Sequence, residues 1–219
     1  MVTLAASSEA SSKPADSTAR PRPRIESLSD MVFGLALSVG ALALVASPPT
    51  NSGELYSDLA TFGFSFLILI MVWFAYTRLM SVLTFEDHWV VTFNTLLLFT
   101  VSVEPFLFNI LESRNIAIGF FDAASQAYAI DLGLMMLVLG LFAWAVSLSK
   151  QPPLAPDVRK GFREEAVSRW ITAGIFFVTV APVFAEIWIY GQPLRTWLWI
   201  VPLVFFGFTR RHREKAQAH

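Results

Sequence analysis

The chain has 219 residues, of which 55% are hydrophobic and 15% are charged, and its net charge is -1 at pH 7. A soluble domain is about 45–50% apolar and about 25% charged, so this composition excludes an ordinary soluble fold. The chain contains no cysteine, which excludes disulfides, iron–sulfur clusters and thiol catalysis.

The first 23 residues are rich in Ser, Ala and Pro and lack the apolar run of a secretory signal. This composition predicts a disordered tail. The last ten residues, 210–219, form a short basic tail. Between the two tails, residues 24–209 are predicted to form one transmembrane domain.

A helix needs roughly 20 apolar residues to cross a bilayer, with about 17–25 as the usual range. Six segments meet or approach this length. They run from Leu28 to Ser47, Leu59 to Met80, Trp89 to Leu111, Ala123 to Leu148, Trp170 to Tyr190, and Leu194 to Thr209. The sequence therefore predicts an all-α, polytopic membrane protein with six transmembrane helices, the last of which is the shortest.

The basic residues are distributed unevenly between the two sides of this predicted topology. Of the 16 Lys and Arg residues, all but Arg114 and Arg195 fall in the two tails or in the loops after the second and fourth spans. Cytoplasmic loops carry the excess of basic residues. The pattern predicts a protein of the cell membrane with both termini in the cytoplasm.

Patterns typical of enzymes are missing from the sequence. No predicted span contains a lysine, and the three histidines, His88, His212 and His219, lie in a loop or in the C-terminal tail. No metal-ligand cluster, phosphate-binding glycine loop or nucleophile triad can be assembled from the predicted elements. We therefore expect neither an enzyme nor a bound cofactor or metal.

Ionisable residues inside membrane spans are costly and are candidates for function. Glu104, Asp131 and Glu186 lie in the predicted outer halves of three spans. They could be interfacial or structural residues, or they could form an outer vestibule that attracts cations. Asp30, near the cytoplasmic end of the first span, could cap that helix or could belong to a polar cluster between helices.

Residues 24–30 read Arg-Ile-Glu-Ser-Leu-Ser-Asp and are followed at once by an apolar helix. This segment resembles the Arg-x-x-x-Phe-Ser-Asp signature of the transmembrane protein 175 family, the potassium channels of lysosomes and their bacterial and archaeal relatives. Residues 66–79, and residues 94–98 with Pro105 and Phe106, are similar to the family's second and third helices. The chain departs from the pattern at Leu28, which replaces the signature phenylalanine, and at Tyr76, where relatives commonly carry histidine.

The resemblance implies a homotetrameric, potassium-preferring channel in which the first helix of each subunit lines the pore. By position, the pore-lining and constriction residues are Leu35, Ser38 and Leu42. The signature and its inter-helix polar cluster comprise Arg24, Leu28, Ser29, Asp30, Tyr76 and Asn94. The expected partners are further copies of the chain, the lipid bilayer and monovalent cations, with K⁺ as the permeant ion and no nucleic acid.

Three alternatives stay open at this point. The first helix could be an ordinary packed helix whose leucines face lipid. The protein could be a proton- or cation-coupled secondary transporter that uses Asp131, Glu104 or Glu186. It could also be a non-conducting scaffold, because Leu28 and Tyr76 depart from the family pattern.

Overall fold

The computed structural model describes residues 24–46, 48–82, 88–113, 117–148, 155–189 and 192–202. The two predicted tails, 1–23 and 210–219, lie outside these residues. The described chain forms five long helices, which are α1 (Arg24–Ala46), α2 (Ser52–Met80), α3 (His88–Glu112), α4 (Ile118–Leu148) and α5 (Pro156–Val178).

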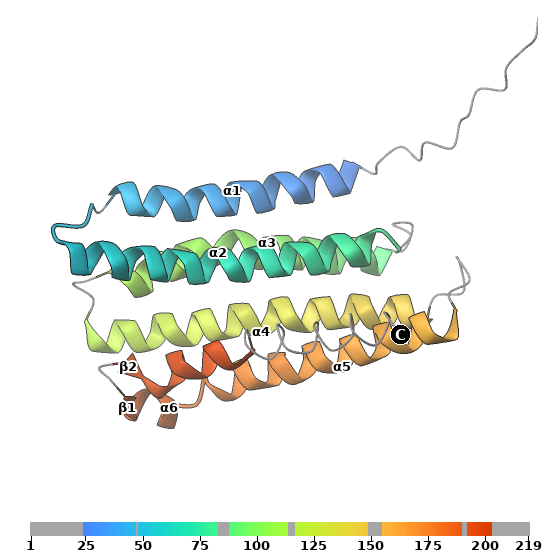
Figure 1. The fold of residues 1–219 in the computed structure, drawn as a ribbon. Coiled ribbons are helices and arrows are strands. Elements are labelled where there is room, and N and C mark those ends of the chain that lie inside the picture. Colours follow the sequence, from blue (N-terminus) through green and yellow to red (C-terminus); the bar gives the residue numbers. More distant parts are fainter. Residues whose placement is uncertain are drawn as a thin grey trace, which may run out of the picture.

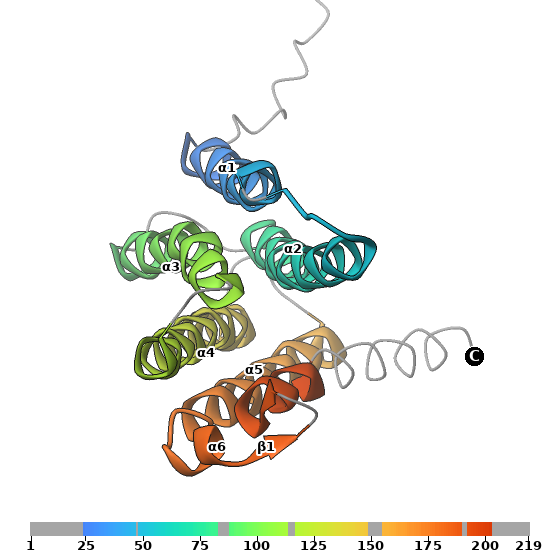
Figure 2. The ribbon, with the colours of Figure 1, turned by 90° about the vertical axis from the view of Figure 1, so that its left-hand side faces the viewer.

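The five helices run up and down in three tiers (Figure 1). α1 forms the outermost tier, α2 and α3 lie beneath it, and α4 and α5 form the third tier. Figure 2, which looks along the helices, shows that α1 packs on α2 and α3 from one side only and lies at the edge of the bundle. α1 therefore keeps one face free of contacts with the other described helices.

The first four helices follow the predicted spans and extend some of them. α2 begins at Ser52 because Asn51 caps it: the Asn51 side chain accepts a hydrogen bond of 2.9 Å from the backbone N–H of Glu54. The Glu54 carboxylate in turn accepts a 2.7 Å bond from the backbone N–H of Thr50. These reciprocal bonds satisfy backbone donors that the first turn of a helix leaves free.

α4 forms the centre of the hydrophobic core. Its fully buried side chains recur at alternating intervals of three and four residues, which places them on one face of a helix. They are Tyr128, Leu132, Met135, Leu139, Phe142 and Val146. α4 packs most extensively against α5 and also contacts α3.

The predicted fifth span, Trp170 to Tyr190, is wrong as a continuous helix. α5 begins at Pro156, fourteen residues earlier, and it ends at Val178. Proline suits the first turn of a helix, where its missing N–H has no partner to lose. At the other end, the ring of Pro182 would clash with the carbonyl of Val178, four residues before it, so a regular helix cannot pass this point.

Beyond α5 the chain turns back on itself. A single-turn helix, α6 (Val183–Glu186), leads into a short antiparallel ribbon of β1 (Trp188–Ile189) and β2 (Gln192–Pro193). Residues 194–202 are again helical. They are the described part of the predicted sixth span, whose remaining residues, 203–209, lie outside the described chain.

Three of the described helices, α2, α3 and α4, are long and apolar enough to cross a membrane. α1 carries a shorter apolar stretch, Ser27–Leu42. The chain is thus a helical protein with several membrane-span candidates, and the count of six crossings stays a prediction.

The two ends of the bundle differ in charge. α1 and α5 begin, and α2 and α4 end, at the same end of the bundle (Figure 1). We call it the basic end because its described residues include Arg78, Arg159, Lys160, Arg163 and Arg169. The opposite end, where α2 and α4 begin, corresponds to the predicted outer side.

Candidate functional site

The signature serine lies at the junction of three helices. Ser29 of α1 is fully buried, and its Oγ accepts a 2.7 Å hydrogen bond from the Tyr76 hydroxyl of α2. The Asn94 side chain of α3 donates to the same oxygen at 3.5 Å. The ring of Phe33 packs 5.7 Å from that of Tyr76, centroid to centroid. The structure therefore brings Ser29, Tyr76 and Asn94 together near the basic end.

The next residue, Asp30, points differently from Ser29. Its side chain is exposed, and Oδ1 accepts a hydrogen bond of 3.1 Å from the Trp73 indole N–H of α2. Leu28 is 54% exposed and lies away from the Ser29 junction. The Arg24 side chain lies outside the part of the chain that the structure describes. The signature therefore joins α1 to its neighbours through two consecutive polar residues.

We expect Tyr76→Phe to destabilise the protein by about 1 kcal/mol, because it removes the hydroxyl that donates to buried Ser29 while keeping the ring. The measurement is the thermal unfolding midpoint in detergent. Tyr56→Phe is the matched control, since Tyr56 is 72% exposed. Equal midpoints for the Tyr76 and Tyr56 variants would show that the Ser29 bond contributes nothing.

The three predicted pore residues lie on the free face of α1. Leu35 is 65% exposed, Leu42 is 63% exposed, and Ser38 between them is also exposed. The Ser38 hydroxyl donates to the Gly34 carbonyl at 2.8 Å, a bond within the helix. The three side chains share one face, and the structure places none of them in the core.

This free face extends along most of α1. Its exposed residues recur at intervals of three, four, three, four and three residues, which is the spacing of a helix seam that packs on another helix. They are Leu28, Met31, Leu35, Ser38, Leu42 and Val45. The opposite face carries the buried residues Ser29, Phe33 and Ala36. We refer to the exposed set as the α1 stripe.

Of the three acids that could form an outer vestibule, two are buried inside the bundle. Glu104 is fully buried and Asp131 is 6% exposed, whereas Glu186 of α6 is exposed. The Ser65 hydroxyl of α2 donates to both Glu104 carboxylate oxygens, at 2.9 and 3.1 Å, and the Tyr128 hydroxyl of α4 donates to one at 3.1 Å. Within this subunit, therefore, two of the three acids face other helices and not an open vestibule.

Sequence reasoning missed the partners of Glu104. The usable signal was that Tyr128 and Asp131 stand three residues apart on one apolar helix, which places both on one face. It also missed a charged network near the basic end. There Glu165 of α5 lies 3.3 Å from Arg78 of α2 and 3.5 Å from Arg169, one turn further along α5.

A further residue that the sequence placed only on the outer side, Arg195, is fully buried. Its guanidinium forms an ion pair of 2.8 Å with Asp122 and donates to Ser125 at 2.6 Å, both at the start of α4. It also donates to the carbonyls of residues 179, 180 and 181, just beyond α5. Arg195 therefore holds the segment that follows α5 against the start of α4 and the end of α5.

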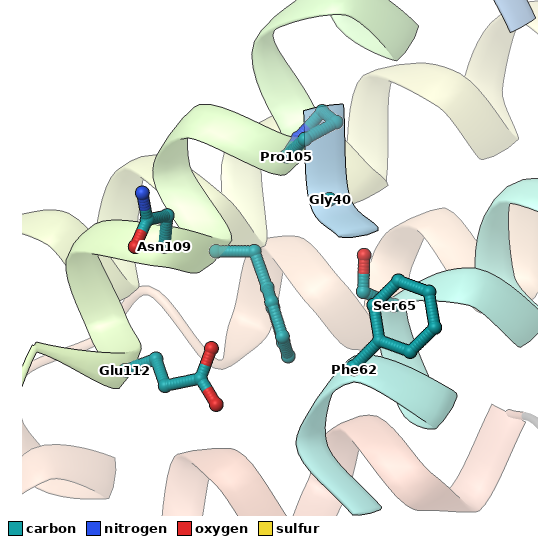
Figure 3. A pocket seen from close by; sticks show the side chains of 7 residues that line it. Gly40, Phe62, Ser65, Pro105, Asn109 and Glu112 are labelled. Atoms are coloured by element: carbon teal, nitrogen blue, oxygen red, sulfur yellow. The ribbon is translucent and has the colours of Figure 1, made fainter. Parts of the chain in front are cut away.

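A small pocket opens between α1, α2 and α3 towards the opposite end of the bundle (Figure 3). Its lining residues are Gly40, Phe62, Ser65, Pro105, Phe108, Asn109 and Glu112. Ser65 thus belongs both to this pocket and to the hydrogen bonds of Glu104. Among the described residues, no group of three or more His, Cys, Asp or Glu side chains could hold a metal ion.

The helices that carry these features are also the part of the chain that matches a known protein family. Residues 24–105, which span α1, α2 and most of α3, match the family described as endosomal/lysosomal potassium channel TMEM175. No curated protein sequence matches the chain. Among solved structures, the fold is similar to a crystal structure of a variant of the potassium channel MtTMEM175 in complex with a nanobody–MBP fusion protein. The TM-score is 0.63 at 16% sequence identity, covering 90% of this chain and 95% of that chain.

The structural likeness, at this low identity, establishes a shared fold. The family match supplies the sequence evidence, and it covers the Ser29 junction and the α1 stripe. On these two grounds, residues 24–105 resemble the TMEM175 family in sequence, and the chain shares the fold of the MtTMEM175 structure.

Proposed function

We propose that this protein is a potassium-preferring cation channel, formed by four copies of the chain with α1 of each subunit lining a central pore. The observation that carries the proposal is the α1 stripe, an apolar seam with no partner among the described residues of its own chain. The family match and the description of the structural neighbour as a potassium channel support it.

The proposed constriction is a ring of four Leu35 side chains, with Ser38 and Leu42 further along the same face. An apolar ring opposes conduction by excluding water from the pore. An ion that passes such a ring must lose part of its hydration shell. Potassium holds its shell less tightly than sodium, so the ring favours potassium, though more weakly than a carbonyl-lined filter would.

The Ser29 junction has a supporting role in this proposal. It fixes one face of α1 against α2 and α3 and thereby directs the α1 stripe away from the subunit. The proposed channel needs no cofactor, and the permeant K⁺ is its substrate. We propose that the basic end faces the cytoplasm of a cell-membrane protein, because cytoplasmic ends of membrane proteins carry the excess of Lys and Arg.

The test is ion flux into liposomes that contain the purified protein. We expect wild-type protein to give a K⁺ flux larger than its Na⁺ flux. Leu35→Ala should raise the total flux several-fold and reduce the preference for K⁺, because it widens the ring. Leu67→Ala is the matched control: Leu67 of α2 is also exposed, at 55%, but lies outside the α1 stripe.

Two outcomes would contradict the proposal. The first is an absence of flux from protein that assembles into intact tetramers. The second is an equal effect of the Leu35 and Leu67 variants, which would mean that the α1 stripe faces lipid as Leu67 does.

A further inference from the structure

Glu104 lies in an unusual setting for an ionised side chain. It is fully buried in the middle tier of the bundle, on a helix long and apolar enough to cross a membrane. Two neutral hydroxyl groups donate to its carboxylate. The single Ser65 proton is shared between the two oxygens, at 2.9 and 3.1 Å, and Tyr128 donates to one of them at 3.1 Å. None of the described Lys, Arg or His residues forms an ion pair with it.

Asp131 is a second acid at the same place. It follows Tyr128 by three residues on α4, so the two side chains share a face. Asp131 is 6% exposed, and its Oδ2 has no hydrogen-bond partner among the described residues. Tyr128 links the two acids: its hydroxyl donates to Glu104 at 3.1 Å, and Asp131 lies one turn further along the same face of α4.

The described side chains that donate to Glu104, or that pack on the Tyr128 ring, are uncharged. α2 contributes Ser65, α4 contributes Tyr128, and the helix of residues 194–202 packs Trp199 against the Tyr128 ring at 5.0 Å. The described Arg195 is paired with Asp122 at 2.8 Å. Glu112, which lines the pocket together with Ser65, adds a negative charge there.

Two adjacent carboxylates cannot both stay ionised when they are buried without a cation. Among the residues that the structure describes, no group of three or more His, Cys, Asp or Glu side chains is placed to hold a metal ion here. A single proton is sufficient, as in other buried carboxyl pairs. Glu104 already accepts hydrogen bonds from two hydroxyl groups, which favour its ionised form, whereas one Asp131 oxygen accepts none.

We propose that Glu104 and Asp131 form a proton-binding site that holds one proton, carried by Asp131, while Glu104 stays ionised. The pocket between α1, α2 and α3 gives this site access to water. Ser65 lines the pocket and donates to Glu104, and Asn109 and Glu112 supply polar groups at the pocket wall (Figure 3). The proton therefore exchanges with water on the side of the bundle opposite to the basic end.

Infrared spectroscopy of the purified protein in lipid tests this proposal, because a protonated carboxylic acid has a C=O stretch that a carboxylate lacks. At neutral pH we expect this band in wild-type protein and a shift of the band after transfer to D₂O. Asp131→Asn should abolish the band, and Glu104→Gln should retain it. Glu186→Gln, which changes an exposed acid, is the matched control and should leave it unchanged.

Three results would overturn the proposal. A wild-type spectrum without the band at neutral pH would exclude a bound proton, whether or not the variants fold. A band that persists in Asp131→Asn and disappears in Glu104→Gln would place the proton on the wrong residue. A band that never shifts in D₂O would exclude access through the pocket. None of these readouts depends on ion conduction. The proton-binding site can therefore be disproved while the proposed channel function stands, and the channel function can be disproved while the proton-binding site stands.

Discussion

Replacing Arg195 with methionine is expected to lower the free energy of unfolding by about 2–3 kcal/mol, because buried hydrogen-bond acceptors lose a charged donor. The guanidinium is fully buried and donates to Asp122, to Ser125 and to three backbone carbonyls. Methionine has a similar length but no donor, so the three carbonyl groups and Ser125 lose this partner inside the protein, whereas Asp122, which is 37% exposed, keeps access to water.

The measurement is the thermal unfolding midpoint of the detergent-solubilised protein. Unfolding is monitored as the fraction of protein that stays monodisperse after heating to each temperature. Lys160→Met is the matched control. Lys160 is exposed, and its pairing with Glu164 spans 4.0 Å, so its loss should cost about 0.5 kcal/mol or less. If the Arg195 and Lys160 variants unfold at the same temperature, Arg195 does not hold the segment that follows α5.

The second large effect is expected at Gly140, where α4 packs closely against α5. A Cβ atom added to Gly140 would overlap the indole ring of Trp170 and would lie 3.3 Å from the backbone carbonyl oxygen of Ala166. About two helical turns earlier on α4, a Cβ on Gly133 would lie 2.6 Å from the Phe177 ring. The two glycines therefore form a groove on α4 that receives the aromatic side chains of α5.

We expect Gly140→Ala to destabilise the protein by about 1–3 kcal/mol, because the methyl group forces α4 and α5 apart or displaces Trp170. Gly174→Ala on α5 is the control, since a Cβ there would meet no atom within 4 Å. In that position alanine should stabilise the helix, by about 1 kcal/mol at most. Thermal unfolding in detergent separates the two expectations by sign. A stabilising Gly140→Ala would show that the helices can repack around a methyl group.

Much of the bundle could be predicted from the sequence, because long apolar helices are determined locally. Length and hydropathy predicted α3 to within a residue at each end, and both the second and fourth spans end at the predicted residue. The same reasoning placed Leu35, Ser38 and Leu42 on one face of the first helix. That prediction needed only the spacing of 3.6 residues per turn, which every regular helix shares.

Other features depended on contacts between residues far apart in the chain. No local pattern indicated that Glu104 would meet Ser65, 39 residues away, or that Asp131 would lie beside it in the core. Hydropathy treats an acid in a span as an exception and gives no information about its neighbours. Whether such an acid faces water or another helix is decided only when the helices pack.

The sequence by itself determined the membrane character of the chain, the course of its first four helices and the signature in residues 24–30 that resembles that of the TMEM175 family. The tertiary structure decided the rest. It ended α5 at Val178, fixed the returning segment through Arg195, and buried Glu104 and Asp131 between the helices. The physical reason is that helix formation depends on neighbours within a few residues, whereas buried charges depend on partners that only the packed helices bring together.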